Sequence, residues 1–298
     1  MTVQTLTLIG FGEVGQMLAK DLPNSSFKPK VKVWDVKFCA PDSIPSKAIE
    51  TVPTYRAPSA AKAATGSDLI ISAVTASQTL DAAKSVCGSV KAGAYFLDLN
   101  SASPRQKEMA SDAIQSAGGK YVEAAIMSPV ALEKISSPIL LGGPNASSFQ
   151  LVAESIGLTG TKIYSESLGK VSAAKMCRSI MVKGIEALLS ESMLAARHYG
   201  VEDTVLNSLA DLFPGPDWHE LSRYMISRSL EHGLRRAEEM REVARTVAEA
   251  GLQPLMSNAC AERQNLSSNF ASAHSIPGLE DMLDQILGDS EPKRDQSP

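Results

Sequence analysis

A run of six residues near the amino terminus has the types and spacing needed to bind a diphosphate. Gly10-Phe11-Gly12-Glu13-Val14-Gly15 directly follows the strand-like residues 5–9 and precedes the helix-forming residues 16–20. In this pattern the first glycine allows a tight turn, the second lets the backbone approach a pyrophosphate, and the third lets the helix pack on the strand. The amides that begin the helix then bind the diphosphate. A glycine turn in another kind of α/β protein is the alternative interpretation.

An acidic residue follows at the distance that such a site requires. Asp35 directly follows a second strand-like run, residues 31–34, and stands 20 positions after Gly15. A carboxylate there accepts hydrogen bonds from the adenosine ribose hydroxyls and repels a 2′-phosphate. The residue therefore predicts NAD as the preferred cofactor, with NADP as the second candidate because Lys37 is close in sequence.

Three polar residues in the second half of the chain share one face of an expected helix. Lys175, Arg178 and Ser179 stand at the i, i+3 and i+4 positions. A lysine acts as a general base when burial or a neighbouring cation favours its neutral amine, and Arg178 would be that cation. The guanidinium of Arg178 also suits a substrate carboxylate. The alternatives are a surface position for Lys175 and an ion pair between Arg178 and an acidic residue such as Glu186.

Strand-like and helix-like runs alternate through the first half of the chain. The expected strands are residues 5–9, 31–34, 68–74, 95–98, 120–124 and 138–141, and the expected helices include residues 59–65, 78–89 and 104–117. This alternation predicts an α/β domain, a Rossmann fold with a doubly wound parallel sheet that binds its ligand at the carboxyl ends of the strands. The glycine run and Asp35 both stand at such ends.

After about residue 165 the pattern is helical throughout. A long helix is expected over residues 169–198 with a stop at Gly200, and a charged amphipathic helix over residues 230–250. The charged residues of the second helix are interpreted as a solvated, ion-paired face: Arg235, Arg236, Glu238, Glu239 and Arg241. We therefore predict an NAD(P)-binding Rossmann domain over 1–165, an all-helical substrate and dimerisation domain over 166–288, and a disordered tail over 289–298.

Composition excludes several other classes of function. The 298 residues carry a formal net charge of −4 without a basic stripe, which argues against a nucleic-acid partner. The four cysteines and four histidines lack metal-binding spacings, so no metal is expected, and the cysteines are expected to be reduced and buried. No run is long and apolar enough for a membrane span, and no secretory signal is evident, so we expect a cytoplasmic protein without a membrane partner.

Together the motifs resemble the β-hydroxyacid dehydrogenase family, which includes 3-hydroxyisobutyrate dehydrogenase and 6-phosphogluconate dehydrogenase. Residues 10–15 resemble the nucleotide loop of this family, and residues 98–104 are similar to its D-x-S-T-x-x-P element. Residues 169–175 are similar to its G-x-x-x-x-x-K segment, which carries the catalytic lysine, and residues 191–200 match the stretch that follows. The resemblance spans about the first two hundred residues.

The resemblance implies hydride transfer between a nicotinamide and a 3-hydroxy acid, with Lys175 as general acid and base in a homodimeric enzyme. It implies that the cofactor contacts Gly10, Phe11, Gly12, Glu13, Val14, Gly15, Asp35, Val74, Thr75, Thr79 and Ser101. It implies that the substrate contacts Asn100, Ser101, Ala102, Ser128, Pro129, Arg178 and Ser179.

Two departures from the family pattern bear on the substrate. Residues 123–129 replace the family's D-A-P-V-S-G-G loop and lack its glycine pair, and Arg178-Ser179 replaces the usual Asn-Asn or His-Asn. We therefore expect a substrate other than the common one. Residues 232–240 are typical of a divergent subgroup with an atypical helical domain. The alternatives are an imine reductase, a class that usually lacks this lysine, and a non-catalytic dinucleotide-binding protein.

Overall fold

The computed structural model describes residues 3–22, 29–127 and 134–290. The chain divides into two compact units, residues 1–177 and 178–298. The division falls inside one helix, α8 (Lys170–Tyr199), whose first residues belong to the first unit. Helix α8 therefore starts in one unit and ends in the other. The expected domain boundary, between residues 165 and 166, precedes this helix, whereas the observed division lies within it.

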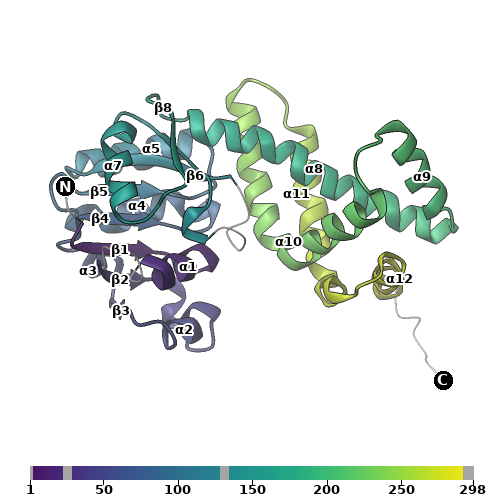
Figure 1. Cartoon of the computed structure of the whole chain (residues 1–298), viewed down its shortest axis with the longest axis horizontal. Helices are drawn as coiled ribbons and strands as arrows, with labels where there is room; N and C mark the ends of the chain where they lie inside the picture. Colours follow the sequence, from purple (N-terminus) through teal and green to yellow (C-terminus); the bar gives the residue numbers. More distant parts are fainter. Residues whose placement is uncertain (1–2, 23–28, 128–133, 291–298) are drawn as a thin grey trace. The chain divides into compact units, whose positions relative to one another are not determined.

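The described part of the first unit contains an eight-stranded sheet (Figure 1). The strands are β1 (Thr5–Ile9), β2 (Lys30–Trp34), β3 (Tyr55–Arg56), β4 (Leu69–Ser72), β5 (Tyr95–Asp98), β6 (Lys120–Ile126), β7 (Ile139–Gly142) and β8 (Thr161–Ser165). Their order across the sheet is β3-β2-β1-β4-β5-β6-β7-β8. The chain reverses its direction of winding between β1 and β4, which is the point where doubly wound sheets bind ligands.

Helices cover both faces of this sheet. On one face, α1 (Glu13–Asp21), α2 (Ile44–Ile49) and α7 (Ala146–Ser155) contribute to a core with alternate strand residues such as Leu8 and Val33. On the other face, α3 (Ala60–Ala64), α4 (Thr79–Val86) and α5 (Pro104–Ser116) pack on Ile70, Phe96 and Tyr121. The structure confirms the expected Rossmann fold, because both sides of its buried strands carry a core.

One pair of strands departs from the expected parallel arrangement. β6 and β7 run antiparallel, with Glu123 opposite Gly142, whereas the other neighbouring pairs are parallel. Alternating strand and helix patterns do not reveal direction at such a pair, since an antiparallel neighbour requires no crossover helix. The structure also contains α2, β3, α7 and β8, for which the sequence showed no clear pattern.

The second unit consists of helices in its described part (Figure 1). Besides most of α8, it contains α9 (Glu202–Leu212), α10 (Trp218–Glu249), α11 (Leu255–Ser267) and α12 (Leu279–Ser290). Its apolar core includes Met193, Ile226, Leu230 and Met282. Helix α10 begins at Trp218 rather than at residue 230, because Asp217 caps it by accepting a hydrogen bond from the Glu220 N–H at 3.0 Å.

Two smaller expectations need correction. Asp289 and Ser290 continue α12, although the sequence suggested a disordered tail from residue 289, and residues 291–298 lie outside the described part. Cys39 and Cys177 are exposed rather than buried, whereas Cys260 is buried.

Within the described ranges no helix is long and apolar enough to cross a membrane, and no group of His, Cys, Asp or Glu is placed to hold a metal ion.

Candidate active site

The glycine turn lies between β1 and α1 in a conformation that depends on its glycines. Gly10 has φ +98°, and a Cβ atom there would lie 2.3 Å from the carbonyl oxygen of Ala73. A Cβ atom on Gly15 would lie 2.2 Å from the carbonyl oxygen of Gly10. Around Gly12, by contrast, a Cβ atom would meet nothing within 4 Å. Gly10 and Gly15 therefore allow close backbone packing, while Gly12 leaves open space at the start of α1.

The start of α1 fits a bound phosphate group. Gly12 is the N-cap residue and supplies no side-chain hydrogen bond to the first turn. The first amides of a helix lack partners within the helix, and their dipoles favour an anion. Glu13 and Val14, the next residues of the predicted set, lie in this first turn, and Glu13 is exposed.

Asp35 lies beside the glycine turn at the end of β2. Its Oδ2 atom accepts a hydrogen bond from the N–H of Phe11 at 2.6 Å, and its Oδ1 atom accepts one from the N–H of Lys37 at 2.8 Å. The Phe11 ring is buried and packs on Phe38, with 5.9 Å between ring centroids. The sequence motif did not indicate that the Asp35 carboxylate accepts a hydrogen bond from the backbone of the glycine turn.

The loops after β4 and β5 are joined by Asn100. Its side-chain oxygen accepts a hydrogen bond from the N–H of Val74 at 2.7 Å, and its Nδ2 donates to the Ser72 hydroxyl at 2.9 Å. Asn100 is buried, so these bonds fix the loop that carries Ser101 and Ala102. Since Gly10 packs against Ala73, the glycine turn, the β4 loop and the β5 loop form one continuous set of contacts.

A buried ion pair supports the loop after β5. Asp98, the last residue of that strand, accepts hydrogen bonds from the Lys107 ammonium at 2.8 Å and the Tyr121 hydroxyl at 2.7 Å. All three side chains are almost fully buried. Burial and the neighbouring Asp98 carboxylate raise the pKa of Tyr121 well above its ordinary value, so the phenol stays protonated and donates.

The start of α8 is attached to the same part of the sheet by Glu123 of β6. Its two carboxylate oxygens accept hydrogen bonds from the backbone N–H groups of Gly169 at 2.8 Å and Ser172 at 2.7 Å. A Cβ atom on Gly169 would lie 3.3 Å from Cβ of Pro104, so α8 and α5 begin side by side. Lys175 follows Ser172 by one helical turn, is half-buried and belongs to the same compact unit as the glycine turn.

The other residues of the predicted set have varied surroundings. Thr75 is exposed, and Ser101 is half-buried. Thr79 is buried and donates its hydroxyl hydrogen bond to the carbonyl oxygen of Ala76 at 2.9 Å. Ala102 is fully buried. Ser128 and Pro129 lie outside the described residues.

Farther along α8, the polar residues belong to the helical unit. Arg178 is exposed, and Ser179 is buried and accepts a hydrogen bond from the Lys183 ammonium at 3.4 Å. Glu186, considered above as a partner for Arg178, is instead paired with Arg236 of α10. Gln264 of α11 also donates to Glu186, at 3.2 Å.

This network corrects the interpretation of α10 as a solvated charged face. Arg235 and Arg241 are exposed as expected, but Arg236 is buried. Glu239 pairs with Lys183 at 2.7 Å as well as with Arg235 at 2.5 Å. The pattern of charges gave no indication of this because the partners, Lys183 and Glu186, are on another helix, α8, and are themselves buried.

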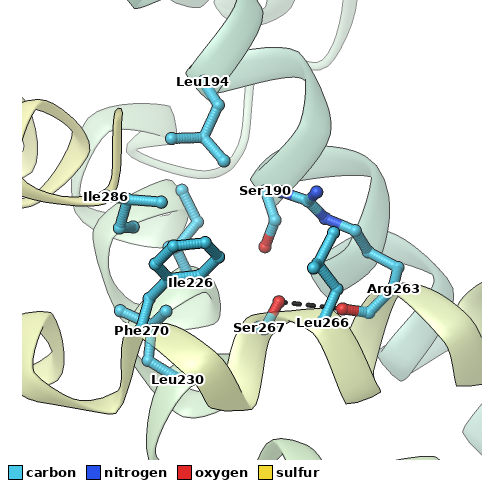
Figure 2. A pocket seen from close by; sticks show the side chains of 9 residues that line it. All are labelled: Ser190, Leu194, Ile226, Leu230, Arg263, Leu266, Ser267, Phe270 and Ile286. Atoms are coloured by element: carbon cyan, nitrogen blue, oxygen red, sulfur yellow. Dashed lines mark hydrogen bonds between the residues drawn. The ribbon is translucent and has the colours of Figure 1, made fainter. Parts of the chain in front are cut away.

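Two cavities among the described residues are lined by none of the residues of the predicted site. One has a volume of about 10 Å³ and lies in the helical unit. Leu194, Ile226, Phe270, Arg263 and Ser267 are among the residues that line it (Figure 2). The Ser267 hydroxyl donates to the backbone oxygen of Arg263 at 3.0 Å (Figure 2). A space of this size holds at most about one water molecule and cannot receive a substrate. An open groove lined by residues such as Lys30, Tyr55 and Thr65 lies at the opposite, amino-terminal edge of the strands.

Sequence reasoning gave no role to Glu123, Lys107 or Tyr121. A usable signal was present, because Glu123 interrupts the apolar part of an expected strand and Lys107 stands on the face of α5 that also carries Ala110 and Ile114. Charged residues at such positions are rarely left without partners.

Comparisons with known proteins agree with this architecture. Residues 5–167 match the family described as the NAD binding domain of 6-phosphogluconate dehydrogenase, and residues 196–266 match a domain of unknown function, DUF1932. A conserved hypothetical protein of Sinorhizobium meliloti 1021 is 31% identical, with 97% of each chain covered and a TM-score of 0.71. The conserved protein MTH1747, of which the structure is reported to be similar to 3-hydroxyacid dehydrogenases, is 30% identical, with 91% of this chain and 98% of that chain covered and a TM-score of 0.66.

The same fold is found at lower identity in an enzyme. Mycobacterium tuberculosis 3-hydroxyisobutyrate dehydrogenase, solved with L-serine, is 14% identical, with 96% of this chain and 99% of that chain covered and a TM-score of 0.70. The family match covers more than half of the chain and includes the glycine turn, Asp35 and the strands that position them. The chain therefore belongs to the family of the 6-phosphogluconate dehydrogenase NAD-binding domain, within the β-hydroxyacid dehydrogenase-like proteins that carry a C-terminal helical domain.

Proposed function

We propose that the protein is an NAD(P)-dependent oxidoreductase that interconverts a 3-hydroxy acid and the corresponding keto acid, with Lys175 as general acid and base. The observation that carries the proposal is the continuous set of contacts at one edge of the sheet. It leads from the glycine turn through the Val74–Asn100 hydrogen bond to the paired starts of α5 and α8. Lys175 follows on α8, one turn beyond the bonds that attach it to the sheet.

The residues at this edge fit a nicotinamide dinucleotide. The open space at Gly12 and the uncapped first turn of α1 suit the pyrophosphate. Asp35 would accept hydrogen bonds from the adenosine ribose with the lone pairs that Phe11 and Lys37 leave available. We propose NAD as the preferred cofactor because a carboxylate at this place repels a 2′-phosphate, with NADP as the second candidate. Val74, Thr75, Thr79 and Ser101 complete the proposed cofactor set.

The proposed chemistry requires one proton transfer between the substrate hydroxyl and the protein. A nicotinamide held by the residues at this edge would supply the hydride acceptor. As the C–H bond of the carbinol carbon breaks and the C=O bond forms, Nζ of neutral Lys175 takes the hydroxyl proton, and in the reverse reaction it returns that proton. Arg178, one turn along α8, favours the neutral amine and binds the substrate carboxylate in a two-point contact.

The remaining residues of the proposed substrate set have supporting roles. Ser101 in the loop after β5 would contact the substrate through its hydroxyl. The hydrogen bonds of Asn100 and the buried Ala102 hold this loop in place. Ser128, Pro129 and Ser179 stay in the proposed set on the family resemblance. We further propose that residues 166–288 act as a substrate and dimerisation domain and that the enzyme is a homodimer.

An activity screen tests this function. Purified protein is mixed with NAD⁺ or NADP⁺ and a panel of linear, branched and aromatic 3-hydroxy acids together with 6-phosphogluconate, and absorbance of the reduced nicotinamide is followed. Reduction with at least one acid is the expected result. A parallel set with reduced dinucleotide and cyclic imines examines the imine reductase alternative, in which only the imines would be turned over. Dinucleotide binding without turnover in either set would favour a non-catalytic binding protein.

A further inference from the structure

Glu123 is a buried carboxylate with an unusual set of partners. It stands in the middle of β6 with no exposed surface. None of the ion pairs between described residues includes it, and its two oxygens accept the N–H groups of Gly169 and Ser172 instead. Because a buried carboxylate requires compensation, the start of α8 supplies it through backbone donors and the positive end of the helix dipole.

The neighbouring strand provides a direct comparison. Asp98 of β5 is the register partner of Glu123 and is equally buried. Its charge is balanced by the Lys107 ammonium, and the Tyr121 hydroxyl donates a further hydrogen bond to it. The two adjacent buried carboxylates therefore have separate partners, and Glu123 on β6 binds only the start of α8 among the described residues.

The packing around Glu123 leaves α8 little freedom to move. Gly142 stands opposite Glu123 on β7, and a Cβ atom there would lie 3.0 Å from Oε2 of Glu123 and 2.7 Å from Cγ2 of Val171. A larger residue at position 142 would force the Val171 side chain or the Glu123 carboxylate to shift. The helix start is thus fixed by two charge-assisted hydrogen bonds and by close contact with the sheet.

We infer that Glu123 is a positioning residue for Lys175: its buried carboxylate fixes the first turn of α8 and, through it, the place of the lysine amine at the carboxyl edge of the sheet. The inference rests on the proposed function of Lys175. The three residues between Ser172 and Lys175 correspond to a rise of about 4.5 Å. A displacement of the first turn therefore reaches Lys175 almost unchanged, and a shift of about 1 Å in a reacting group can lower a rate by about 100-fold.

The test compares Glu123→Gln with Glu123→Asp. Glutamine keeps the shape but loses the charge and turns an NH₂ group toward one of the two N–H donors, whereas aspartate keeps the charge on a shorter side chain. We expect Glu123→Gln to lower kcat by roughly 10- to 100-fold, with the Kd of the dinucleotide changed by less than about twofold. We expect kcat of Glu123→Asp to lie between those of Glu123→Gln and the wild type. Glu154→Gln, an exposed glutamate of α7 in the same unit, is the control and should match the wild type.

Two outcomes would overturn the inference. The first is a wild-type kcat for Glu123→Gln. The second is a loss of kcat that is equal in Glu123→Gln and Glu123→Asp and is accompanied by a parallel loss of dinucleotide affinity, because a purely structural role would have this effect. If Glu123→Gln does not fold, Glu123→Asp decides: a lowered kcat at unchanged dinucleotide affinity supports the inference, and a wild-type kcat contradicts it. Lys175→Ala measured in parallel separates the two proposals, because wild-type turnover in that variant would refute the proposed function itself.

Discussion

Asp35 illustrates how one side chain can serve both the fold and the cofactor. Its Oδ2 atom accepts the N–H of Phe11 inside the glycine turn, and the same carboxylate is proposed to accept the ribose hydroxyls. Loss of this residue would therefore affect more than the choice between NAD and NADP, because it would also remove the 2.6 Å hydrogen bond to the turn that forms the proposed pyrophosphate site.

We expect Asp35→Ala to weaken the binding of both dinucleotides and to narrow the preference for NAD over NADP. Loss of hydrogen bonds to a charged acceptor costs about 1.5–3 kcal/mol, which corresponds to roughly 10- to 100-fold in NAD affinity. Calorimetric titration with each dinucleotide measures the effect. Asp42→Ala, at an exposed carboxylate, is the matched control. An unchanged ratio of the two affinities would mean that the adenosine ribose is recognised by other residues.

Single residues also mark the limit of what the sequence could predict about the site. The glycines and Asp35 were identifiable because their roles depend on local spacing. Glu123 and Arg236 were not, because their roles depend on partners that are distant in sequence: Glu123 binds a helix start 46 residues later, and Arg236 pairs with Glu186 on another helix. A charged residue within an apolar pattern indicates a buried partner but does not identify it.

Among the elements, the glycine turn allows two substitutions with opposite expectations. A Cβ atom on Gly12 meets no protein atom, and its φ of −75° suits alanine, so Gly12→Ala should keep the thermal stability of the protein. The added methyl would occupy the space proposed for the pyrophosphate, so the dinucleotide Kd should rise at least about tenfold, or ~1.4 kcal/mol. Differential scanning fluorimetry and calorimetric titration measure the two effects.

Gly15→Ala is the contrasting variant. Its Cβ atom would lie 2.2 Å from the carbonyl oxygen of Gly10, so α1 must move away from β1. We expect the melting temperature to fall together with dinucleotide affinity. Wild-type affinity in Gly12→Ala would exclude the start of α1 as the pyrophosphate site.

The elements themselves were predictable to different degrees. The structure confirms the helix expected over residues 104–117 as α5, which begins in a typical way with Ser103 as its cap and Pro104 as its first residue. The direction of β7 was not predictable, since strand patterns contain no information about direction. The start of α10 was missed because its cap, Asp217, follows Pro216 and is not followed by a continuous apolar run.

For the whole molecule, α8 carries a feature relevant to assembly. Met181, Leu188 and Tyr199 are 64%, 61% and 76% exposed, and their spacing of 7 and 11 residues places them along one stripe of the helix. Exposed apolar surface can mark an interaction site, and most soluble oligomers are homo-oligomers. This stripe supports the proposed homodimer.

We expect the double substitution Met181→Glu with Leu188→Glu to convert a dimer into a monomer, because two carboxylates on the stripe would repel those of the partner. Light scattering at micromolar concentration measures the mass. Leu151→Glu, on the exposed surface of α7 with 73% exposure, is the matched control and should leave the mass unchanged. A monomeric wild-type protein would contradict the proposal.

The net charge of −4 is less informative for the whole molecule than the placement of a few cations. A site for an anionic cofactor and an anionic acid needs positive charge only locally, and Lys175 and Arg178 are proposed to supply it. The central claim is that Lys175 carries the proton step of a dinucleotide-dependent oxidation.

The most direct measurement compares turnover of the wild type, Lys175→Ala and Lys170→Ala on the hydroxy acid identified by the screen, at saturating dinucleotide. Lys170 is exposed in the first turn of the same helix and serves as the control. We predict that Lys175→Ala binds the dinucleotide as the wild type does but loses at least about 100-fold in kcat, while Lys170→Ala keeps wild-type turnover. Wild-type turnover in Lys175→Ala would contradict the claim.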